Sequence, residues 1–335
     1  MAESDFVTPI KPVKRKWPSR DSTNVSVSTP LNKEPKTLTI PPSPFLKQLG
    51  YGTGINVYLM QQPATPSGRV KSPWAVKKLS SLVNKSPNGL KTYETRLAYE
   101  ANILKGLDHP NIVGYRDAVR GDDGRLCLCM ESGEKSLNQL IELRQEEGEP
   151  FPPNKIHKVV YAASSALDYL HNNKKLLHGD IKSHNILVKG DFAEIKLCDF
   201  GVCMKLKEDL QGLADDSDEY VGTSAYTSSE VLSGGLITDK ADIYSLGCVI
   251  YEMLSLTMPH MPHMLDDSEL SFDESAFSEA LGTVPALPDM SYDKLLHPYI
   301  ALMMICCRED AERRPAAREI CETLQQLVEK PGLLE

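Results

Sequence analysis

The sequence has no long apolar run. None of its 335 residues lie in a stretch that approaches the ~18 apolar residues needed for a membrane-spanning helix. Residues 1–16 also lack the apolar core of a signal peptide. We therefore expect neither a membrane protein nor a secreted one.

Cysteine is sparse and poorly spaced for a structural role. The eight cysteines are too few for a disulfide scaffold in a chain of this length. Cys127 and Cys129 are separated by one residue, and Cys306 and Cys307 are adjacent, so neither pair has the CxxC spacing of a zinc site. Free thiols in a reducing compartment are expected.

Positive charge is in deficit. The chain has 37 Lys and Arg against 46 Asp and Glu, a net charge of −9, which argues against nucleic acid as a partner. Residues 1–40 carry +3, so the remainder carries −12. The 53 residues between Lys240 and Lys294 contain no Lys or Arg. We expect the acids there to favour basic partners or the chain's own basic tail. They include Asp266, Asp267, Asp273 and Glu274.

Residues 1–44 predict a disordered regulatory tail. They hold eight of the 23 prolines, are rich in Ser, Thr and Lys, and show almost no apolar periodicity. Thr8-Pro9-Ile10-Lys11 fits the pattern that a proline-directed cyclin-dependent kinase phosphorylates, so Thr8 is a candidate phosphorylation site. The basic run Lys14–Lys16 leaves three functions open: a nuclear signal, a docking segment for a MAP kinase, or a solvated basic tail.

From residue 45 onward, a strand-rich half precedes a helix-rich half, which predicts an α+β fold without internal repeats. Strand-like alternation occupies Leu49–Met60, Trp74–Leu79 and Leu126–Met130, and a hairpin joins Ile186–Val188 to Ile195–Cys198. Helical spacing occupies Thr92–Leu107, a stretch after Pro153, Ile243–Leu254 and Ala316–Val328.

The glycine-rich segment Gly50–Val57 lies between two predicted strands. Its glycines would let backbone N–H groups approach phosphate oxygens, although unliganded glycine-rich hairpins are also common. The pattern GxxxxGK[ST] of a Walker A loop is absent. A strand rather than a helix follows Val57, which excludes a Rossmann fingerprint.

Two charged residues could serve a phosphate site. Lys77 ends a strand-like run and could point into a cleft to pair with phosphate oxygens. Glu100 lies in a helical run and could hold Lys77 in position. Taken singly, either residue could equally be a solvated surface charge.

The segment Leu177–Val188 has the most specific pattern. Asp180 could orient or deprotonate a hydroxyl group, and Lys182 could neutralise a phosphoryl group during transfer. Asn185 offers an uncharged oxygen to a hard divalent cation. The predicted hairpin then returns the chain to Asp199, whose carboxylate would lie near Asn185, so that the two could hold Mg²⁺.

In this order and spacing, residues 45–330 resemble the eukaryotic protein kinase family, and MAP-kinase-kinase-like members most closely. The motifs that match are Gly50–Val57, Lys77, Glu100, His178–Asn185, Asp199–Gly201, Gly222–Glu230, Asp242–Gly247 and Arg314. The resemblance implies a two-lobed kinase fold, with a small β-rich N-lobe at 45–131, a larger helical C-lobe at 132–329 and a short tail at 330–335.

The resemblance also implies a role for each matching residue. Asp180, Lys182 and Lys77 would be catalytic, Asn185 and Asp199 would bind Mg²⁺, and Glu230 would pair with Arg314 in a structural contact. ATP would be held by Leu49, Gly50, Tyr51, Gly52, Thr53, Gly54, Ile55, Asn56, Val57, Ala75, Lys77, Glu100, Met130, Glu131 and Gly133.

The implied reaction is transfer of the γ-phosphoryl group of MgATP to protein substrates. Lys182, two residues after Asp180, is typical of Ser/Thr acceptors, and Tyr stays open as a second acceptor. The resemblance further implies activity in mitosis, a MAP kinase among the substrates, and a cytoplasmic and nuclear location that includes the mitotic spindle. A nucleotide-binding scaffold with little catalytic activity is the alternative.

Two departures from the family pattern carry consequences. Gly179 stands where the family has Arg, which removes the guanidinium that grips a phosphate on the activation loop. We therefore expect activity to depend less on phosphorylation of that loop. The chain ends in Glu335, whereas a PDZ ligand ends in an apolar residue, which argues against PDZ binding.

Overall fold

The computed structural model describes residues 47–52, 55–61, 72–80, 87–121, 123–261, 274–289 and 292–328. The chain divides into two units, 1–38 and 39–335, and every described residue lies in the second. Several features of the sequence fall outside the described residues: the tail 1–44 with Thr8, the acids Asp266, Asp267 and Asp273, and residues 330–335 with Glu335.

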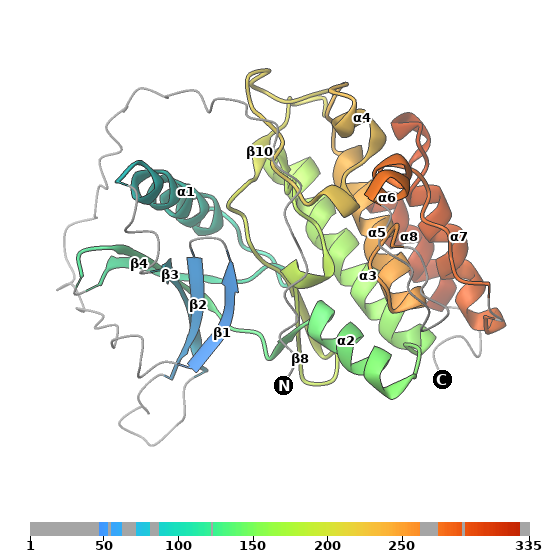
Figure 1. Cartoon of the computed structure of the whole chain (residues 1–335), viewed down its shortest axis with the longest axis horizontal. Helices are drawn as coiled ribbons and strands as arrows, with labels where there is room; N and C mark the ends of the chain where they lie inside the picture. The colour runs from blue at the N-terminus through green and yellow to red at the C-terminus, as the bar shows by residue number, and fades with distance from the viewer. Residues whose placement is uncertain are drawn as a thin grey trace. The chain divides into compact units, whose positions relative to one another are not determined.

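A five-stranded antiparallel sheet opens the described chain (Figure 1), with the strand order β1-β2-β3-β5-β4. Its strands are β1 (Lys47–Gly52), β2 (Ile55–Met60), β3 (Trp74–Leu79), β4 (Tyr115–Arg120) and β5 (Leu126–Glu131). In register, Val57 faces Lys77 and Ala75 faces Met130. Because directly paired residues share a face, these four side chains lie on one side of the sheet. Helix α1 (Pro87–Lys105) packs against β3, β4 and β5.

The rest of the described chain is mainly helical. Its longer helices are α2 (Leu137–Glu147), α3 (Pro153–Asp168), α5 (Lys240–Ser255), α7 (His297–Cys306) and α8 (Ala317–Val328), and α4 (Ser229–Leu232) and α6 (Glu274–Ala280) are short. Three short strands form a sheet in which β8 (Ile186–Lys189) lies between β6 (Lys135–Ser136) and β9 (Glu194–Leu197). A separate pair is formed by β7 (Leu176–Leu177) and β10 (Met204–Lys205). The β-rich N-lobe and helical C-lobe are confirmed. No helix in the described ranges combines the length and apolarity needed to cross a membrane.

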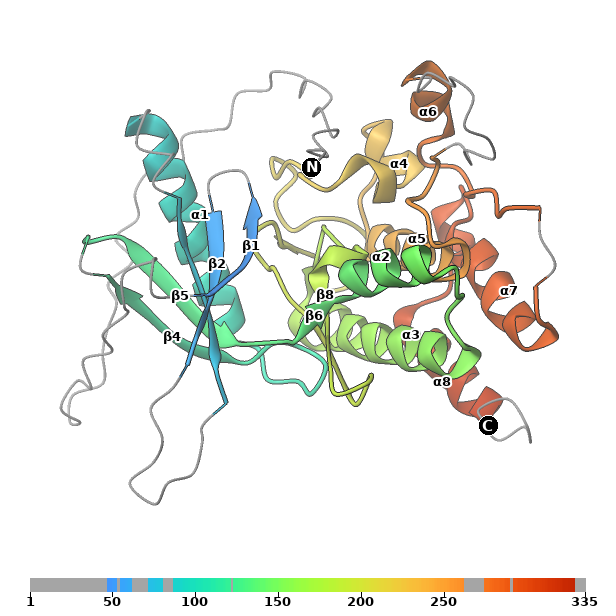
Figure 2. The ribbon, with the colours of Figure 1, turned by 60° about the horizontal axis from the view of Figure 1, so that its bottom comes forward.

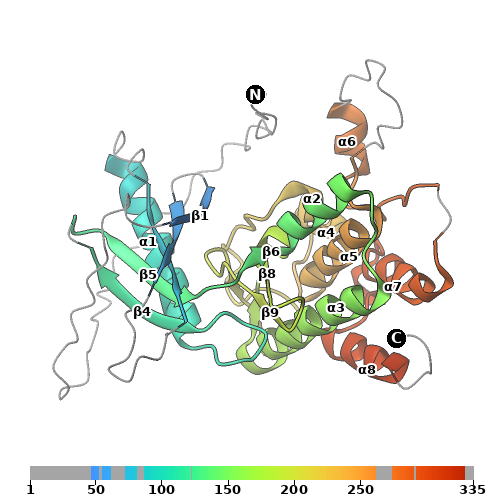
Figure 3. The same ribbon diagram turned by 90° about the horizontal axis from the view of Figure 1, so that it is seen from below.

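Helix α5 is the centre of the helical lobe. It packs against both α3 and α7, and α8 lies along α3 (Figures 2 and 3). Every residue from Ala241 to Leu254 is buried, so the polar residues Asp242, Ser245 and Glu252 lie inside the lobe together with the apolar ones.

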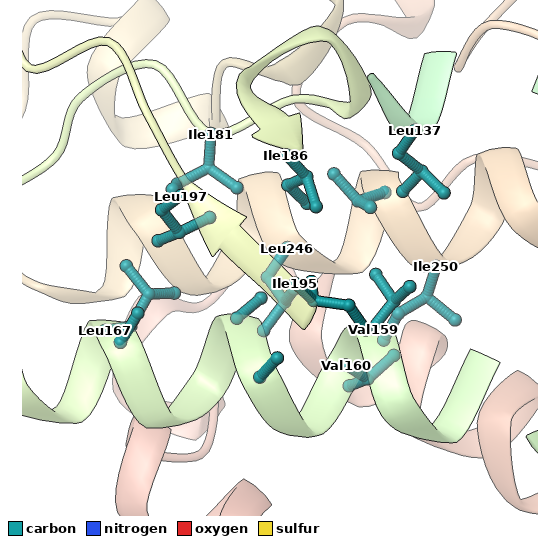
Figure 4. Close-up of a cluster of buried hydrophobic side chains, with 14 of the residues drawn as sticks. Leu137, Val159, Val160, Leu167, Ile181, Ile186, Ile195, Leu197, Leu246 and Ile250 are labelled. Carbon is teal, nitrogen blue, oxygen red and sulfur yellow. The ribbon is translucent and has the colours of Figure 1, made fainter. Parts of the chain in front are cut away.

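Apolar side chains clamp the β8–β9 hairpin between helices (Figure 4). Val159, Val160 and Leu167 of α3 approach the hairpin from one side, and Leu246 and Ile250 of α5 belong to the same buried cluster. Ile186, Ile195 and Leu197 of the hairpin complete it. Each such side chain stabilises the fold by about 1.5–3 kcal/mol through burial. The polar loop that precedes β8 therefore stands on a rigid base.

Arg314 joins α4 to the region before α8. Its guanidinium donates to both carboxylate oxygens of Glu230, at 2.7 and 2.8 Å, and to the carbonyl oxygens of Arg308, Glu309 and Lys240. The Arg314 side chain is fully buried and lies over the Tyr244 ring, 5.2 Å from its centroid. Every charge in this site is compensated, and the predicted pairing of Glu230 with Arg314 is confirmed.

Breaking this pair should be costly because it leaves a buried, uncompensated charge. We expect Arg314→Ala to lower the free energy of unfolding by about 3–5 kcal/mol, as measured by urea denaturation. The neighbouring Arg313 pairs with Asp310 at the surface, where both side chains are more than half exposed. Arg313→Ala is the matched control and should change the free energy by at most about 1 kcal/mol. Equal losses in the two variants would contradict this account.

Candidate active site

Lys77 connects the sheet, helix α1 and the start of the activation segment (residues 199–230). Its Nζ atom donates to Glu100 Oε1 and Oε2 at 3.0 and 2.8 Å, and to Asp199 Oδ1 at 2.8 Å. Lys77 and Glu100 are both buried, whereas the Asp199 side chain is 44% exposed. The predicted contact between Lys77 and Glu100 is confirmed.

Lys77 and Asp199 stabilise each other's charge, whereas burial and the charge of Asp199 raise the pKa of Glu100 above its usual value, against the opposing charge of Lys77. Burial alone would lower the pKa of the Lys77 ammonium, but the nearby carboxylates of Asp199 and Glu100 raise it above its usual range. Burial would likewise raise the pKa of Asp199, but the charge of Lys77 and their hydrogen bond lower it. At neutral pH, Lys77 is therefore a fixed cation and Asp199 an anion.

A second polar network surrounds Asp180 in the catalytic loop (residues 178–185). Thr223 Oγ1 donates to Asp180 Oδ1 at 2.7 Å, and Lys182 Nζ lies 2.8 Å from both Asp180 Oδ2 and Thr223 Oγ1. Asn185 Nδ2 donates to the backbone oxygen of Asp180 at 2.8 Å and to its Oδ2 at 3.0 Å. Asp180 and Lys182 are thus held in fixed orientation from three sides.

The catalytic loop is anchored from below by Asp242 of α5, which is fully buried. Its carboxylate accepts hydrogen bonds from the backbone N–H groups of His178 and Gly179, at 2.8 and 2.9 Å, and contacts His171 Nε2 at 2.8 Å. Burial would raise the pKa of Asp242, but these partners lower it below its usual range. A buried carboxylate anion therefore sets the path of the loop.

Gly179 fits this anchored loop for a conformational reason. Its φ is +78°, and a Cβ atom there would lie 3.2 Å from the carbonyl oxygen of Val202. Glycine therefore relieves both the strained backbone and a close contact with the activation segment.

Asn185 and Asp199 have the donor chemistry of a site for a hard cation. Both side-chain hydrogen bonds of Asn185 use its Nδ2 atom, and Lys77 contacts Oδ1 of Asp199, so Asn185 Oδ1 and Asp199 Oδ2 offer oxygen ligands. No cluster of three or more His, Cys, Asp or Glu side chains able to hold a metal exists among the described residues. The donor set fits Mg²⁺, which takes one or two protein ligands with phosphate and water as the rest.

The face of the sheet that carries Lys77 has the apolar character of a base-binding wall. Val57, Ala75 and Met130 share that face, and Leu49 is a partly buried residue of β1 that packs against the same core. Gly133 follows β5, and a Cβ atom there would lie only 2.8 Å from the Cβ atom of Leu187. This close packing leaves no room for a side chain at position 133.

The remaining predicted nucleotide residues divide by position. Gly50, Tyr51 and Gly52 end β1, and Ile55 begins β2 on the Lys77 face, whereas Thr53 and Gly54 lie outside the described residues. Asn56 points to the opposite face, where its Nδ2 donates to the Tyr58 hydroxyl, so only its backbone could face a nucleotide. The Glu131 side chain accepts from the Gly114 N–H and pairs with Lys196. These assignments stay predictions.

Sequence reasoning left out two groups that complete the site. Leu187 lies against Gly133, and its place two residues after Asn185 in an apolar run could have indicated this. Ser183 donates to Glu252 of α5 at 2.9 Å, a contact without any sequence signal. Thr223, which belongs to the predicted motif Gly222–Glu230, bridges Asp180 and Lys182 from 41 residues along the chain.

Comparisons with known proteins agree with this geometry. The family model described as the protein kinase domain matches residues 44–324. The chain is 44% identical to the human lymphokine-activated killer T-cell-originated protein kinase, over 96% of this chain and 98% of that protein.

More distant relatives match the same region. The serine/threonine-protein kinase Nek11 of Macaca fascicularis is 32% identical over 88% of this chain, which spans 42% of that protein. A serine/threonine-protein kinase STE7 homolog of Candida albicans is 30% identical over 74% of this chain and 38% of that protein. With the paired Lys77 and Glu100, the anchored catalytic loop and the family match over most of its length, the chain belongs to the protein kinase family.

Proposed function

We propose that this kinase transfers the γ-phosphoryl group of ATP to Ser and Thr residues of protein substrates. The observation that carries the proposal is the network in which Lys182 contacts both the Asp180 carboxylate and the Thr223 hydroxyl. Similarity to proteins named as serine/threonine kinases supports the choice of acceptor. Tyr stays open as a second acceptor.

Catalysis by these residues is mainly positioning and charge stabilisation. Lys77, oriented by Glu100, binds phosphate oxygens. Asp180 accepts the proton of the substrate hydroxyl, and Lys182 balances charge on the phosphoryl group. Asn185 and Asp199 would hold Mg²⁺, which supplies neutralising charge to the phosphates.

The alternative is a scaffold that binds nucleotide without catalysis. Against it, none of the groups in named catalytic roles is replaced, and the Lys77–Glu100 pair is formed. Because a scaffold needs no acceptor for a substrate proton, the retained network around Asp180 favours the enzyme.

Finer assignments form the second part of the proposal. The resemblance of residues 45–330 to MAP-kinase-kinase-like members of the family supports a role of that kind in mitosis, with a MAP kinase as substrate and a cytoplasmic, nuclear and spindle location. Thr8-Pro9 supports phosphorylation of Thr8 by a cyclin-dependent kinase, which phosphate mapping on mitotic protein would test.

In the family, an Arg at the position of Gly179 binds a phosphate on the activation segment. In this chain, apolar side chains pack around that segment instead. Strand β10 pairs with β7, and Leu206 forms a bridge with Leu213. Leu177, Met204, Leu206, Leu213 and Ala241 form a buried cluster around these contacts. The exposed ion pair between Lys207 and Asp216 adds little. These contacts support the proposal that side chains order the segment without a phosphate.

Removing phosphate from the activation segment should change kcat by no more than about twofold, because Gly179 offers no guanidinium to bind it. Leu213→Ala should instead lower kcat and speed proteolysis within residues 206–219, because the cluster loses a buried side chain. Leu232→Ala, at a 47% exposed position, is the control. The proposal fails if phosphatase treatment abolishes the activity of the wild type.

Asp180→Ala should lower kcat for a Ser/Thr peptide by roughly 10²–10⁴-fold, since it removes the proton acceptor. Its ATP affinity should stay near the wild-type value. Asp199→Asn should have its larger effect on binding: it should weaken Mg²⁺-dependent ATP binding more than Asp180→Ala does. Radiolabelled phosphate transfer and equilibrium nucleotide binding measure the two effects. Equal phosphorylation by the wild type and Asp180→Ala would remove the enzyme claim and favour the scaffold.

A further inference from the structure

Glu252 of α5 is a buried carboxyl group beneath the active site. Its side chain is almost fully enclosed, with the residue only 3% exposed. Oε1 accepts a hydrogen bond from Ser183 Oγ at 2.9 Å, and the Ser183 N–H and the Tyr226 hydroxyl are further hydrogen-bonding neighbours of the carboxyl group. Oε2 is buried and has no hydrogen-bond partner within the described part of the chain. An acid held in this way needs an explanation, because burial of an incompletely bonded carboxylate is costly.

The two neighbours of Glu252 belong to the two segments that form the reaction centre. Ser183 directly follows Lys182 in the catalytic loop. Tyr226 ends the short helical turn that begins just after Thr223, and its N–H donates to the Thr223 carbonyl at 2.9 Å. The turn is also tied to α5, since Ser245 Oγ donates to the Tyr226 carbonyl at 2.7 Å. Glu252 therefore bridges the segment that carries Lys182 to the segment that carries Thr223.

Few charged groups face Glu252 from the surrounding elements. Lys182 is the cation that acts on it from the catalytic loop, Tyr226 faces it from the activation segment, and Cys248 of α5 lies beside Tyr226. His157 of α3, the helix packed against α5, contacts the Tyr299 hydroxyl instead. With little compensation, burial raises the pKa of Glu252 to about 7, against the opposing effect of the hydrogen bonds from Tyr226 and Ser183.

We propose that Glu252 is a positioning residue that bridges the catalytic loop and the activation segment through Ser183 and Tyr226, and that its carboxylate form tightens this contact and speeds phosphoryl transfer. The proposal rests on the proposed kinase activity. It assigns a role to a residue that touches neither the nucleotide nor the reacting atoms.

The direction follows from hydrogen-bond strength. A carboxylate accepts stronger and shorter hydrogen bonds from Ser183 and Tyr226 than a neutral acid does. Its negative charge also favours the Lys182 ammonium, which contacts Asp180 and Thr223. Ionisation of Glu252 thus favours the arrangement of Lys182 and Thr223 around Asp180, whereas protonation loosens it.

The same group should affect stability in the opposite sense. Its pKa in the folded protein is raised above its unfolded value of about 4.5, so the fold favours the neutral acid. The stability that this preference contributes is fully present below the unfolded pKa and is lost as the pH rises through about 7. Ionised Glu252 therefore favours activity while it weakens the fold.

The test is the pH dependence of kcat for a Ser/Thr peptide at saturating MgATP, measured from pH 5.5 to 8.5. Wild-type kcat should rise about two- to fivefold with a midpoint near pH 7. Glu252→Gln, which keeps the shape but cannot ionise, should have a lower kcat that lacks this rise. Ser183→Ala should move the midpoint to higher pH, because the ionised form loses a donor. Glu147→Gln, at an exposed position on α2, should retain the wild-type profile.

Thermal unfolding provides a readout that does not require activity. The melting temperature of Glu252→Gln relative to the wild type should rise by about 2–4 °C between pH 6 and pH 8, as the wild type loses the remaining contribution of the neutral acid. A kcat profile with the wild-type rise in Glu252→Gln would overturn the proposal, as would an unchanged midpoint in Ser183→Ala. If every variant and the wild type lacked phosphoryl transfer, the proposed function would fail instead, and the melting difference would still report the titration of Glu252.

Discussion

The active site depends on one buried anion, the carboxylate of Asp242 at the start of α5. Its oxygens accept two backbone N–H groups of the catalytic loop and contact His171, which is why a charge can be stable with no exposed surface. Without this anchor, the short loop that carries Asp180 would have no fixed path between β7 and β8. The apolar clamp on the hairpin holds the other end of the same loop.

Other polar residues of α5 extend this anchoring to the rest of the site. Ser245 fixes the turn after Thr223, Glu252 contacts the residue after Lys182, and the Tyr244 ring supports Arg314. One rigid helix therefore sets the position of both segments that meet around Asp180. Lys77 joins the sheet and α1 to Asp199, so the predicted nucleotide-binding half is tied to the same framework.

Much of the fold could be predicted from sequence because its periodic segments are buried on consistent faces. The strands at Trp74–Leu79 and Leu126–Met130, the Ile186–Cys198 hairpin and the helix at Ile243–Leu254 were all readable. Helix α2 was missed although Ser136 and Gln139 form a capping box and Gly148 ends the helix at a φ of +70°. Strand β4 was missed because its burial pattern has no clear alternation.

The catalytic groups were predictable because motif spacing identifies them, but their supports were not. Spacing along the chain cannot show that Thr223 closes onto Asp180, or that Glu252 reaches Ser183 across 69 residues. Such contacts depend on how α5 packs beneath the loop. These contacts are seen only in the folded structure, where segments that are distant in the sequence lie side by side.

Single-turnover phosphoryl transfer by Asp242→Asn, compared with the wild type at matched folded fraction, tests the central claim most directly. An asparagine amide would turn a donor toward the N–H groups of His178 or Gly179, so the loop should lose its anchored path. The account predicts a rate lower by on the order of 10²-fold, with ATP affinity preserved because Lys77, Glu100 and Asp199 are untouched. A folded Asp242→Asn protein that transfers phosphate at the wild-type rate would contradict it.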